Sequence, residues 1–355
     1  MKTKKGKLIY NIVTFALVII AYVIISSMIA NKSISRTLKG QLIPICCWIV
    51  MAVSLNLVVG ISGELSLGHA GFMGIGAFTG IIVSGWLLNG YQMEDASLRL
   101  LIAIVAGGLI AGIAGVLIGI PVLRLRGDYL AIVTLAFGEI IKNVMNCVYV
   151  AVDGTHLNWA FINNANIQGT LLLNGPMGAV KVKTISTFTA GFILVMLSLL
   201  FVLNLINSRA GRAIMAVRDN RIAAESMGVP VTRYKMMAFV SASVMAGMAG
   251  ALYGLNMATL VPTKFSFNES INVLVFVVMG GIGNTLGAVI SATVLTVLPE
   301  RLRFLQNYRM LVYAVVLIIA MLATNNATIK GWAMKLTARI RGKKEDETEK
   351  GGQAV

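Results

Sequence analysis

Four ionisable side chains stand inside long apolar stretches of the sequence: Glu64, His69, Glu139 and Lys142. Because a charge at membrane depth is costly, each of them needs a partner or a function. Glu139 and Lys142 are three residues apart, a spacing that puts them on one face of a helix, and we interpret them as a structural ion pair. His69 forms either a hydrogen bond to nearby backbone, which we favour, or a proton relay with Ser66.

Sequence motifs for catalysis and nucleotide binding are absent. The chain contains no G-x-x-x-x-G-K-[ST], H-E-x-x-H or G-x-S-x-G pattern. His69 and His156 are the only histidines, and the cysteines have no metal-binding spacing. We expect Cys46, Cys47 and Cys147 to be small buried apolar side chains. The sequence therefore predicts no catalytic residue, metal or cofactor of its own, so any ATP hydrolysis must occur on another subunit.

The elements that position these residues are apolar runs. Hydrophobic residues make up 57% of the 355-residue chain and charged residues 12%, against about 25% in an average soluble domain. Since a membrane-spanning helix needs roughly 20 apolar residues, we predict an all-α polytopic membrane protein with about 8 to 10 transmembrane segments. The runs are 8–30, 42–61, 67–89, 99–123, 129–150, 188–206, 236–258, 271–299 and 308–324. The first run is too long for a signal peptide and is expected to be a retained helix.

The charge distribution predicts which loops share a side of the membrane. Thirty Lys and Arg against 14 Asp and Glu give a net charge of +16, which we assign to membrane topology and not to nucleic-acid binding. The positive-inside rule places the basic N-terminus, residues 1–7, and the basic segment 207–235 in the cytoplasm, and the loop 151–187 outside. The transmembrane domain is expected to cover 8–324, followed by a charged tail, 325–355.

That tail is also basic, although nine simple crossings would put it outside. The number of crossings becomes even, and the tail returns to the cytoplasm, if the 271–299 run enters and leaves the membrane by the same face. Its central GGIGNTLG, Gly280–Gly287, permits this by breaking the run into two half-helices. Both termini are then cytoplasmic.

A second glycine-rich interruption lies at Asn56–Gly80, and the two interrupted segments resemble an internal repeat. Broken helices expose backbone groups to a cavity and often mark the substrate path of a transporter. The candidate pathway residues are Asn56, Gly63, Ser66, Gly68, His69, Gly283 and Asn284. The alternative is that glycines only permit close helix packing. We favour that alternative for Gly107, Gly108, Gly112, Gly115 and Gly119.

The segment 207–235 contains a short helix-compatible stretch that ends at a glycine and a proline. Short helices with small side chains fit grooves on partner proteins, although an ordinary interfacial loop is the alternative. Its candidate docking residues are Arg218, Asp219, Ala223, Ala224, Glu225 and Gly228. Ala223 and Ala224 are expected to be small enough for close docking.

Four long motifs carry a family resemblance that covers roughly residues 45 to 320. They are LNLVVGISGELSLGHAGFMGIGAFTG (55–80), RGDYLAIVTLAFGEIIKNV (126–144), the segment 211–235, and VMGGIGNTLGAVISATVLTVLPERLRF (278–304). In this order they resemble the LivM-type branched-chain amino acid permeases of bacterial ABC importers, and 207–235 resembles their coupling loop. The chain departs from the family after the last helix, where TNNATIKG replaces an FRPQGL-like stretch.

The resemblance implies a permease subunit in the bacterial inner membrane, without its own ATPase activity. It also implies a heterodimer with a paralogous permease, two ABC ATPase subunits that bind ATP and magnesium, and an extracytoplasmic binding protein that delivers leucine, isoleucine or valine. Three alternatives remain. One is a permease for urea or short amides. The others are an ion-coupled secondary carrier, which would transport alone, and a membrane enzyme using Glu64 and His69.

Overall fold

The computed structural model describes residues 4–31, 36–125, 127–161 and 169–302, together with 314, 315 and 318. The chain divides into two units, Met1–Thr296 and Val297–Val355. Apart from the last residues of α11, the features discussed below belong to the first unit. The predicted helix at 308–324, apart from those three isolated positions, and the tail 325–355 lie outside the described residues.

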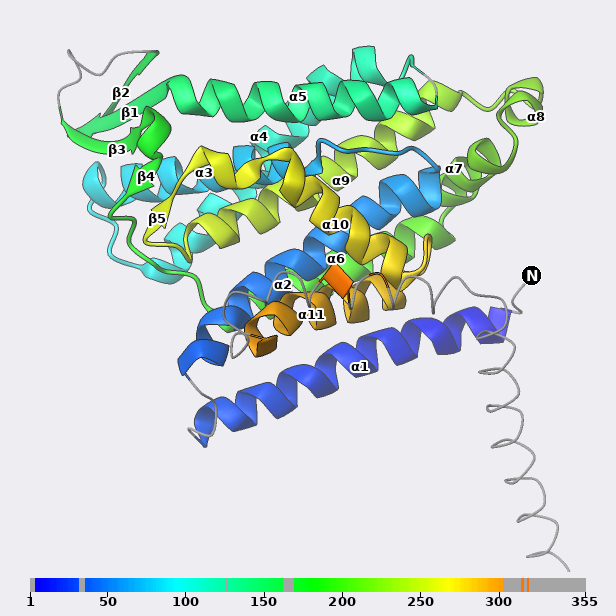
Figure 1. Cartoon of the computed structure of the whole chain (residues 1–355), viewed down its shortest axis with the longest axis horizontal. Helices are drawn as coiled ribbons and strands as arrows, with labels where there is room; N and C mark the ends of the chain where they lie inside the picture. Colours follow the sequence, from blue (N-terminus) through cyan, green and yellow to red (C-terminus); the bar gives the residue numbers. More distant parts are fainter. Residues whose placement is uncertain are drawn as a thin grey trace, which may run out of the picture. The chain divides into compact units, whose positions relative to one another are not determined.

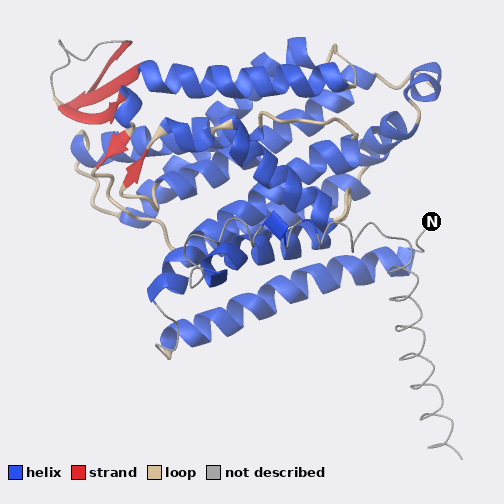
Figure 2. Cartoon of the chain, viewed as in Figure 1, coloured by secondary structure: helices blue, strands red, loops and turns tan. Residues whose placement is uncertain are grey.

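Seven helices in the described part of the chain are long and apolar enough to cross a membrane (Figure 1). They match the first seven predicted runs and confirm the all-α polytopic fold. Their bounds are α1 Lys4–Ala30, α2 Arg36–Asn56 continued by the π-helix η1 Leu57–Ser62, α3 His69–Asn89, α4 Ala96–Val122, α5 Asp128–Cys147, α6 Phe188–Asn207 and α9 Val231–Gly254. Strands are confined to one end of these helices (Figure 2).

The run predicted at 129–150 ends earlier as a helix, because β-branched and aromatic residues after Cys147 form a strand. β1 Val148–Asp153 pairs antiparallel with both β2 His156–Phe161 and β3 Thr170–Asn174. A second small sheet joins β4 Ala179–Val180 to β5 Thr259–Leu260. Short 3-10 turns, η2 Gly175–Met177 and η3 Pro262–Phe265, complete this end. Cys46 and Cys47 are buried as expected, but Cys147 is exposed, so the prediction is wrong for this residue.

Small residues bring α3, α4 and α9 into close contact. A Cβ at Gly76 would lie 2.0 Å from the Gly247 carbonyl oxygen, and a Cβ at Gly107 would lie 2.9 Å from the Gly76 carbonyl oxygen, so neither position has room for one. The other glycines of α4 also face α9, which confirms their predicted packing role. The facing pairs are Gly108 with Met248, Gly112 with Val244, Gly115 with Ser243, and Gly119 with Met236.

The orientation of α1 relative to α6 shows which segments lie at the same end of the helices. Tyr22 of α1 stacks on Phe188 and Phe192 of α6, with ring centroids 5.4 and 4.0 Å apart, while Asn11 shares a cavity with Asn207 at the other end of α6. α1 and α6 are therefore antiparallel, and the start of α1 lies at the same end as α7 Arg209–Asp219 and α8 Arg221–Ser226 (Figure 1). The strands lie at the opposite end. This agrees with the predicted grouping of the N-terminus with 207–235, opposite 151–187.

The predicted break in the 271–299 run is confirmed. α10 Phe267–Gly280 and α11 Thr285–Arg301 are joined by a turn in which Gly281 and Gly283 have φ of +89° and +82°, a region that favours glycine. The Ser291 hydroxyl donates a hydrogen bond to the Phe276 carbonyl, and Gly280 packs on Gly287. The two helices therefore form an antiparallel hairpin, as the predicted break into two half-helices requires.

The close contact of α4 with α9 generates a prediction about stability. A Cβ at Gly247 would lie 2.5 Å from the Gly107 carbonyl oxygen, whereas a Cβ at Gly40 in α2 would meet nothing within 4 Å. Gly247→Ala should therefore destabilise the folded protein by about 1–3 kcal/mol, while Gly40→Ala should be neutral or slightly stabilising. Thermal unfolding in detergent measures both. Equal melting temperatures for the two variants would contradict this packing.

Candidate functional site

The first broken segment turns back into the helix bundle. η1 is followed by Gly63, which has φ +77°, and the chain then runs without regular structure to α3. His69, the first residue of α3, places its Nε2 2.7 Å from the Ser54 hydroxyl, and Ser54 lies eight residues before the end of η1. The segment 63–68 therefore folds back along the preceding helix, and α3 begins inside the bundle, where His69 is buried.

Side chains from distant helices satisfy the backbone groups that this irregular segment exposes. The Leu67 N–H donates to the Thr134 hydroxyl of α5 at 3.0 Å, and the Ala70 N–H donates to the Ser270 hydroxyl of α10 at 3.1 Å. Irregular backbone at membrane depth is tolerated only where protein or water supplies such partners. The sequence reasoning did not identify Ser54, Thr134 or Ser270. In the sequence, each of these residues could be recognised as a small polar residue within an apolar run.

The two broken segments meet directly. The side-chain oxygen of Asn56, a fully buried residue, accepts a hydrogen bond from the Gly283 N–H at 2.8 Å. A Cβ at Gly60 would lie 2.7 Å from the Gly283 Cα, so Gly60 must be a glycine for this approach. Of the predicted pathway residues, Asn56, Gly63, Gly283 and Asn284 therefore gather at one place, which we call the junction.

Arg218 of α7 connects the junction to the segment 207–235. Its Nη1 donates to the Gly60 carbonyl at 2.7 Å, and its aliphatic stem packs against Gly63, where a Cβ would meet the Arg218 Cγ at 2.5 Å. Its Nε and Nη2 donate to Oδ1 of Asp219 at 3.1 and 2.9 Å. Arg218 therefore holds α7 against the first broken segment through both packing and a charge-assisted hydrogen bond.

A second link joins the same two parts of the chain. Lys235, in the first turns of α9, forms an ion pair with Glu64, and the two side chains are only 11% and 12% exposed. This contact supplies the partner that Glu64 needs inside an apolar stretch. The segment 207–235 is thus connected to the first broken segment at Arg218, near its middle, and at Lys235, its last residue.

A cavity of about 460 Å³ opens at the junction. Most of its polar lining comes from α1, the end of α6, α7 and the turn between α10 and α11. The polar contributors are Asn11, Asn207, Arg218, Gly283, Asn284 and Thr285. Since this lining offers amide, hydroxyl and guanidinium groups, the cavity suits a polar or zwitterionic solute.

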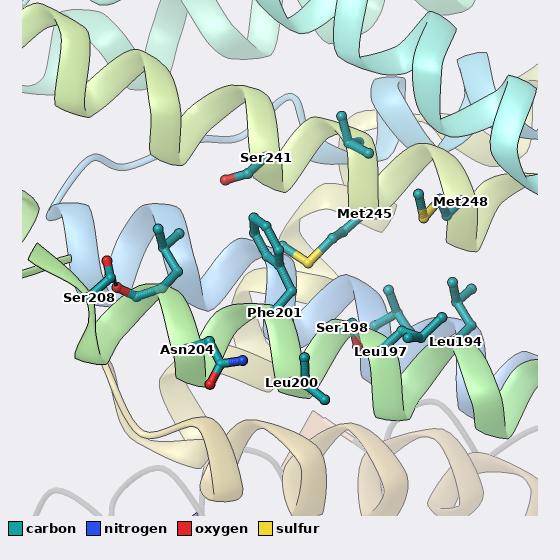
Figure 3. A pocket seen from close by; sticks show the side chains of 13 residues that line it. Leu194, Leu197, Ser198, Leu200, Phe201, Asn204, Ser208, Ser241, Met245 and Met248 are labelled. Carbon is teal, nitrogen blue, oxygen red and sulfur yellow. Dashed lines mark hydrogen bonds between the residues drawn. The ribbon is translucent and has the colours of Figure 1, made fainter. Parts of the chain in front are cut away.

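The larger pocket between α6 and α9 has a different chemistry. Its volume is about 730 Å³, and Leu194, Leu197 and Phe201 of α6 face Met245 and Met248 of α9 across it (Figure 3). None of the residues lining it is charged. It therefore offers no counter-charge for a zwitterion, and we retain the junction cavity as the candidate site.

Three predicted pathway residues lie outside the junction, and of the seven only Gly283 and Asn284 line its cavity. Ser66 is buried, and its hydroxyl has no partner among the described residues. Gly68 packs against the Thr134 carbonyl, and the buried His69 bonds to the Ser54 hydroxyl. The partner of His69 is therefore neither Ser66 nor the neighbouring backbone, contrary to both interpretations of the sequence.

The Glu139–Lys142 ion pair is confirmed. The second carboxylate oxygen of Glu139 accepts the N–H of Phe267 at 3.0 Å. Phe267 is the first residue of α10, where a carboxylate satisfies a free N–H group and interacts favourably with the helix dipole. Glu139 therefore also fixes the start of the hairpin that carries Gly283.

Local contacts at its two ends stabilise the short helix α8. The Asn220 side chain accepts the Ala223 N–H at 3.0 Å, Arg221 and Glu225 pair at 2.9 Å, and Gly228 ends the turn with φ +77°.

Ala224 is buried inside the segment, against Val217, Val229 and Val231. It therefore does not present its side chain for docking, contrary to expectation, whereas Ala223 is exposed. Ile222 and Met227 of the same segment, which the sequence reasoning missed, are 77% and 84% exposed.

These features define a multi-span membrane permease built around two interrupted helices. Comparison with known proteins agrees. The family model for the permease component of branched-chain amino acid transport systems matches residues 38–321. The chain therefore belongs to this family of transport subunits.

Individual relatives support the assignment. The LivM high-affinity branched-chain amino acid transport permease of Salmonella typhimurium is 37% identical over 67% of this chain and 57% of its own length. The chain thus spans little more than half of that relative. A probable LivM permease of Methanocaldococcus jannaschii is 22% identical over 66% of this chain and 72% of its own length. The ribose import permease RbsC of Escherichia coli is 26% identical over 65% of each chain. No solved structure gives a significant match.

The double role of Glu139 generates a second prediction. Glu139→Leu removes the partners of both Lys142 and the Phe267 N–H, and should cost about 1–3 kcal/mol, since the pair is partly exposed. Glu139→Leu with Lys142→Leu should cost less, because no unpaired charge remains. The amount of folded protein in membranes and its melting temperature measure both. A single variant that folds normally but fails to transport would instead make Glu139 a pathway residue.

Proposed function

We propose that this chain is the permease subunit of an ATP-driven importer of branched-chain amino acids. It works with a second permease, two ATPase subunits that bind ATP and magnesium, and an extracytoplasmic binding protein that delivers the substrate. It lies in the bacterial inner membrane with both termini and α7–α8 in the cytoplasm. The family membership and the names of the two LivM relatives support this assignment.

The observation that carries the proposal is the contact of Arg218 with Gly60. It connects α7, at the end of the molecule rich in basic residues, with the place where the broken segments meet. ATPase subunits that move α7–α8 would therefore pull on the Gly60 carbonyl and change the Asn56–Gly283 contact. Such gating of a fixed site by a rigid element is a common transport mechanism.

The exposed side of α8 is the proposed docking surface for an ATPase subunit. Ile222 and Met227 are apolar, highly exposed and next to the exposed Ala223. An apolar patch rimmed by charged groups such as Arg221 and Glu225 is typical of a protein interface.

Three alternatives make different predictions. A ribose permease is among the relatives at 26% identity, and urea or short amides would also suit a polar cavity. An ion-coupled carrier would transport without partner subunits. The higher identity to the Salmonella amino acid permease favours branched-chain amino acids.

Reconstitution tests the function. Proteoliposomes containing the chain, its partner permease and ATPase subunits should take up leucine, isoleucine or valine when ATP and the binding protein are supplied. The chain alone should neither hydrolyse ATP nor transport. Uptake by the isolated chain in an ion gradient would establish an ion-coupled carrier. Uptake of ribose or urea alone would show that the substrate is not a branched-chain amino acid.

The Arg218 contact generates a further prediction. Arg218→Met keeps the aliphatic packing on Gly63 but removes the hydrogen bond to Gly60, so uptake per ATP hydrolysed should fall roughly tenfold. Arg209→Met, an exposed arginine in the same helix, serves as the control and should leave this ratio unchanged. Equal coupling ratios in the two variants would show that α7 does not act through Gly60.

A further inference from the structure

Arg99 is a buried cation, and two of its guanidinium nitrogens have no hydrogen-bond partner among the described residues. It lies in the first turn of α4, at the end of the molecule that carries the strands, and is 4% exposed. Its Nε and Nη1 have no hydrogen-bond partner among the described residues. Since an unpaired buried guanidinium is strongly unfavourable, the side chain requires a partner from outside the described chain.

Arg99 lines a cavity of about 390 Å³, a size in the usual range for small-ligand sites. Lys181 and Lys183, in the segment after β4, contribute two more positive charges to the same lining. No acidic side chain lines this cavity. Its electrostatics therefore favour an anionic group.

The backbone at Lys181 adds an independent observation. Lys181 has φ +59°, one of two non-glycine residues with positive φ in the described chain. A lysine gains nothing locally from this conformation, which costs about 1–3 kcal/mol. Strained residues of this kind cluster at ligand sites, and here the strain occurs at a residue that lines the cavity.

The rest of the lining is mainly aliphatic. Ile81 and Leu88 of α3, Leu171 and Leu172 of β3, and Leu255 after α9 surround the charged group. The cavity thus combines a cationic head-group site with an apolar wall. This combination fits a molecule with one carboxylate or phosphate attached to an aliphatic body.

We propose that this outer cavity, around Arg99, Lys181 and Lys183, binds an anionic head group attached to an aliphatic body. The first candidate for this anionic group is the carboxylate of a branched-chain amino acid that arrives on the outer side. This choice rests on the proposed function. The other source of the same chemistry is the phosphate of an anionic lipid. Neither source needs the junction cavity, which lies at the opposite end of the helices.

The test uses the full transporter complex in phosphatidylcholine nanodiscs. Ligand-induced rises in melting temperature give affinities for leucine, for 4-methylpentanoate, which lacks the ammonium group, and for leucinol, which lacks the carboxylate. Leucine and 4-methylpentanoate should bind and leucinol should not. Loss of one charge-assisted contact in Arg99→Gln should weaken binding of both acids roughly tenfold to a hundredfold.

Matched variants separate binding from folding. Lys181→Gln with Lys183→Gln changes only exposed residues and should weaken both acids several-fold without altering the unliganded melting temperature. Arg99→Lys retains the charge and should recover part of the affinity. Lys264→Gln, an exposed lysine in η3 outside the cavity lining, should bind like the wild type.

Lipid composition distinguishes the two sources. If phosphatidylglycerol raises the melting temperature of the wild type but not of Arg99→Gln, and reduces acid binding, the anion site is upheld and its occupant is lipid. If neither acid nor phosphatidylglycerol acts through Arg99, Lys181 and Lys183, the proposal is overturned. Uptake assays on the same complex report the proposed function separately, because leucine transport with unchanged binding in these variants would reject only the outer site.

Discussion

Backbone N–H and C=O groups freed by a broken helix need partners at membrane depth, and here the protein itself supplies many of them. Thr134 and Ser270 bond the N–H groups of Leu67 and Ala70, and Asn56 bonds that of Gly283. Each contact joins parts of the chain that are far apart in the sequence. The positions of α5 and α10 relative to the first broken segment follow from the first two bonds, and the third bond joins the two broken segments.

The same constraint connects the interior to the surface. Arg218 satisfies the Gly60 carbonyl, and it belongs to a helix next to the exposed α8. Lys235 neutralises Glu64 in the segment that follows Gly63. A force applied to α7–α8 therefore acts on bonds that the broken segment needs, which is the physical basis of the coupling proposed above.

The packing of α3, α4 and α9 provides the rigid part against which such movement can occur. Glycines place these helices at backbone contact, so small shifts there would meet backbone atoms rather than flexible side chains. The two cavities with polar or charged lining lie at the two ends of these helices. One end holds the junction cavity, and the other holds the cationic cavity around Arg99.

The sequence by itself determined the features that depend on neighbours along the chain. Apolar run length predicted the spanning helices, glycine content predicted the break at Gly280–Gly287, and three-residue spacing predicted the Glu139–Lys142 pair. These are local properties of helices, and periodicity reports them.

Contacts between distant residues were decided only by the tertiary structure. Asn56 and Gly283 are 227 residues apart, and Arg218 and Gly60 are 158 apart. The burial of Ala224 and the Ser54 partner of His69 likewise depend on which helices pack together, and so does the burial of Arg99 Nε and Nη1 without a partner in the described part of the chain. No spacing rule reports such contacts, because they arise from the packing of whole helices and not from the pitch of one.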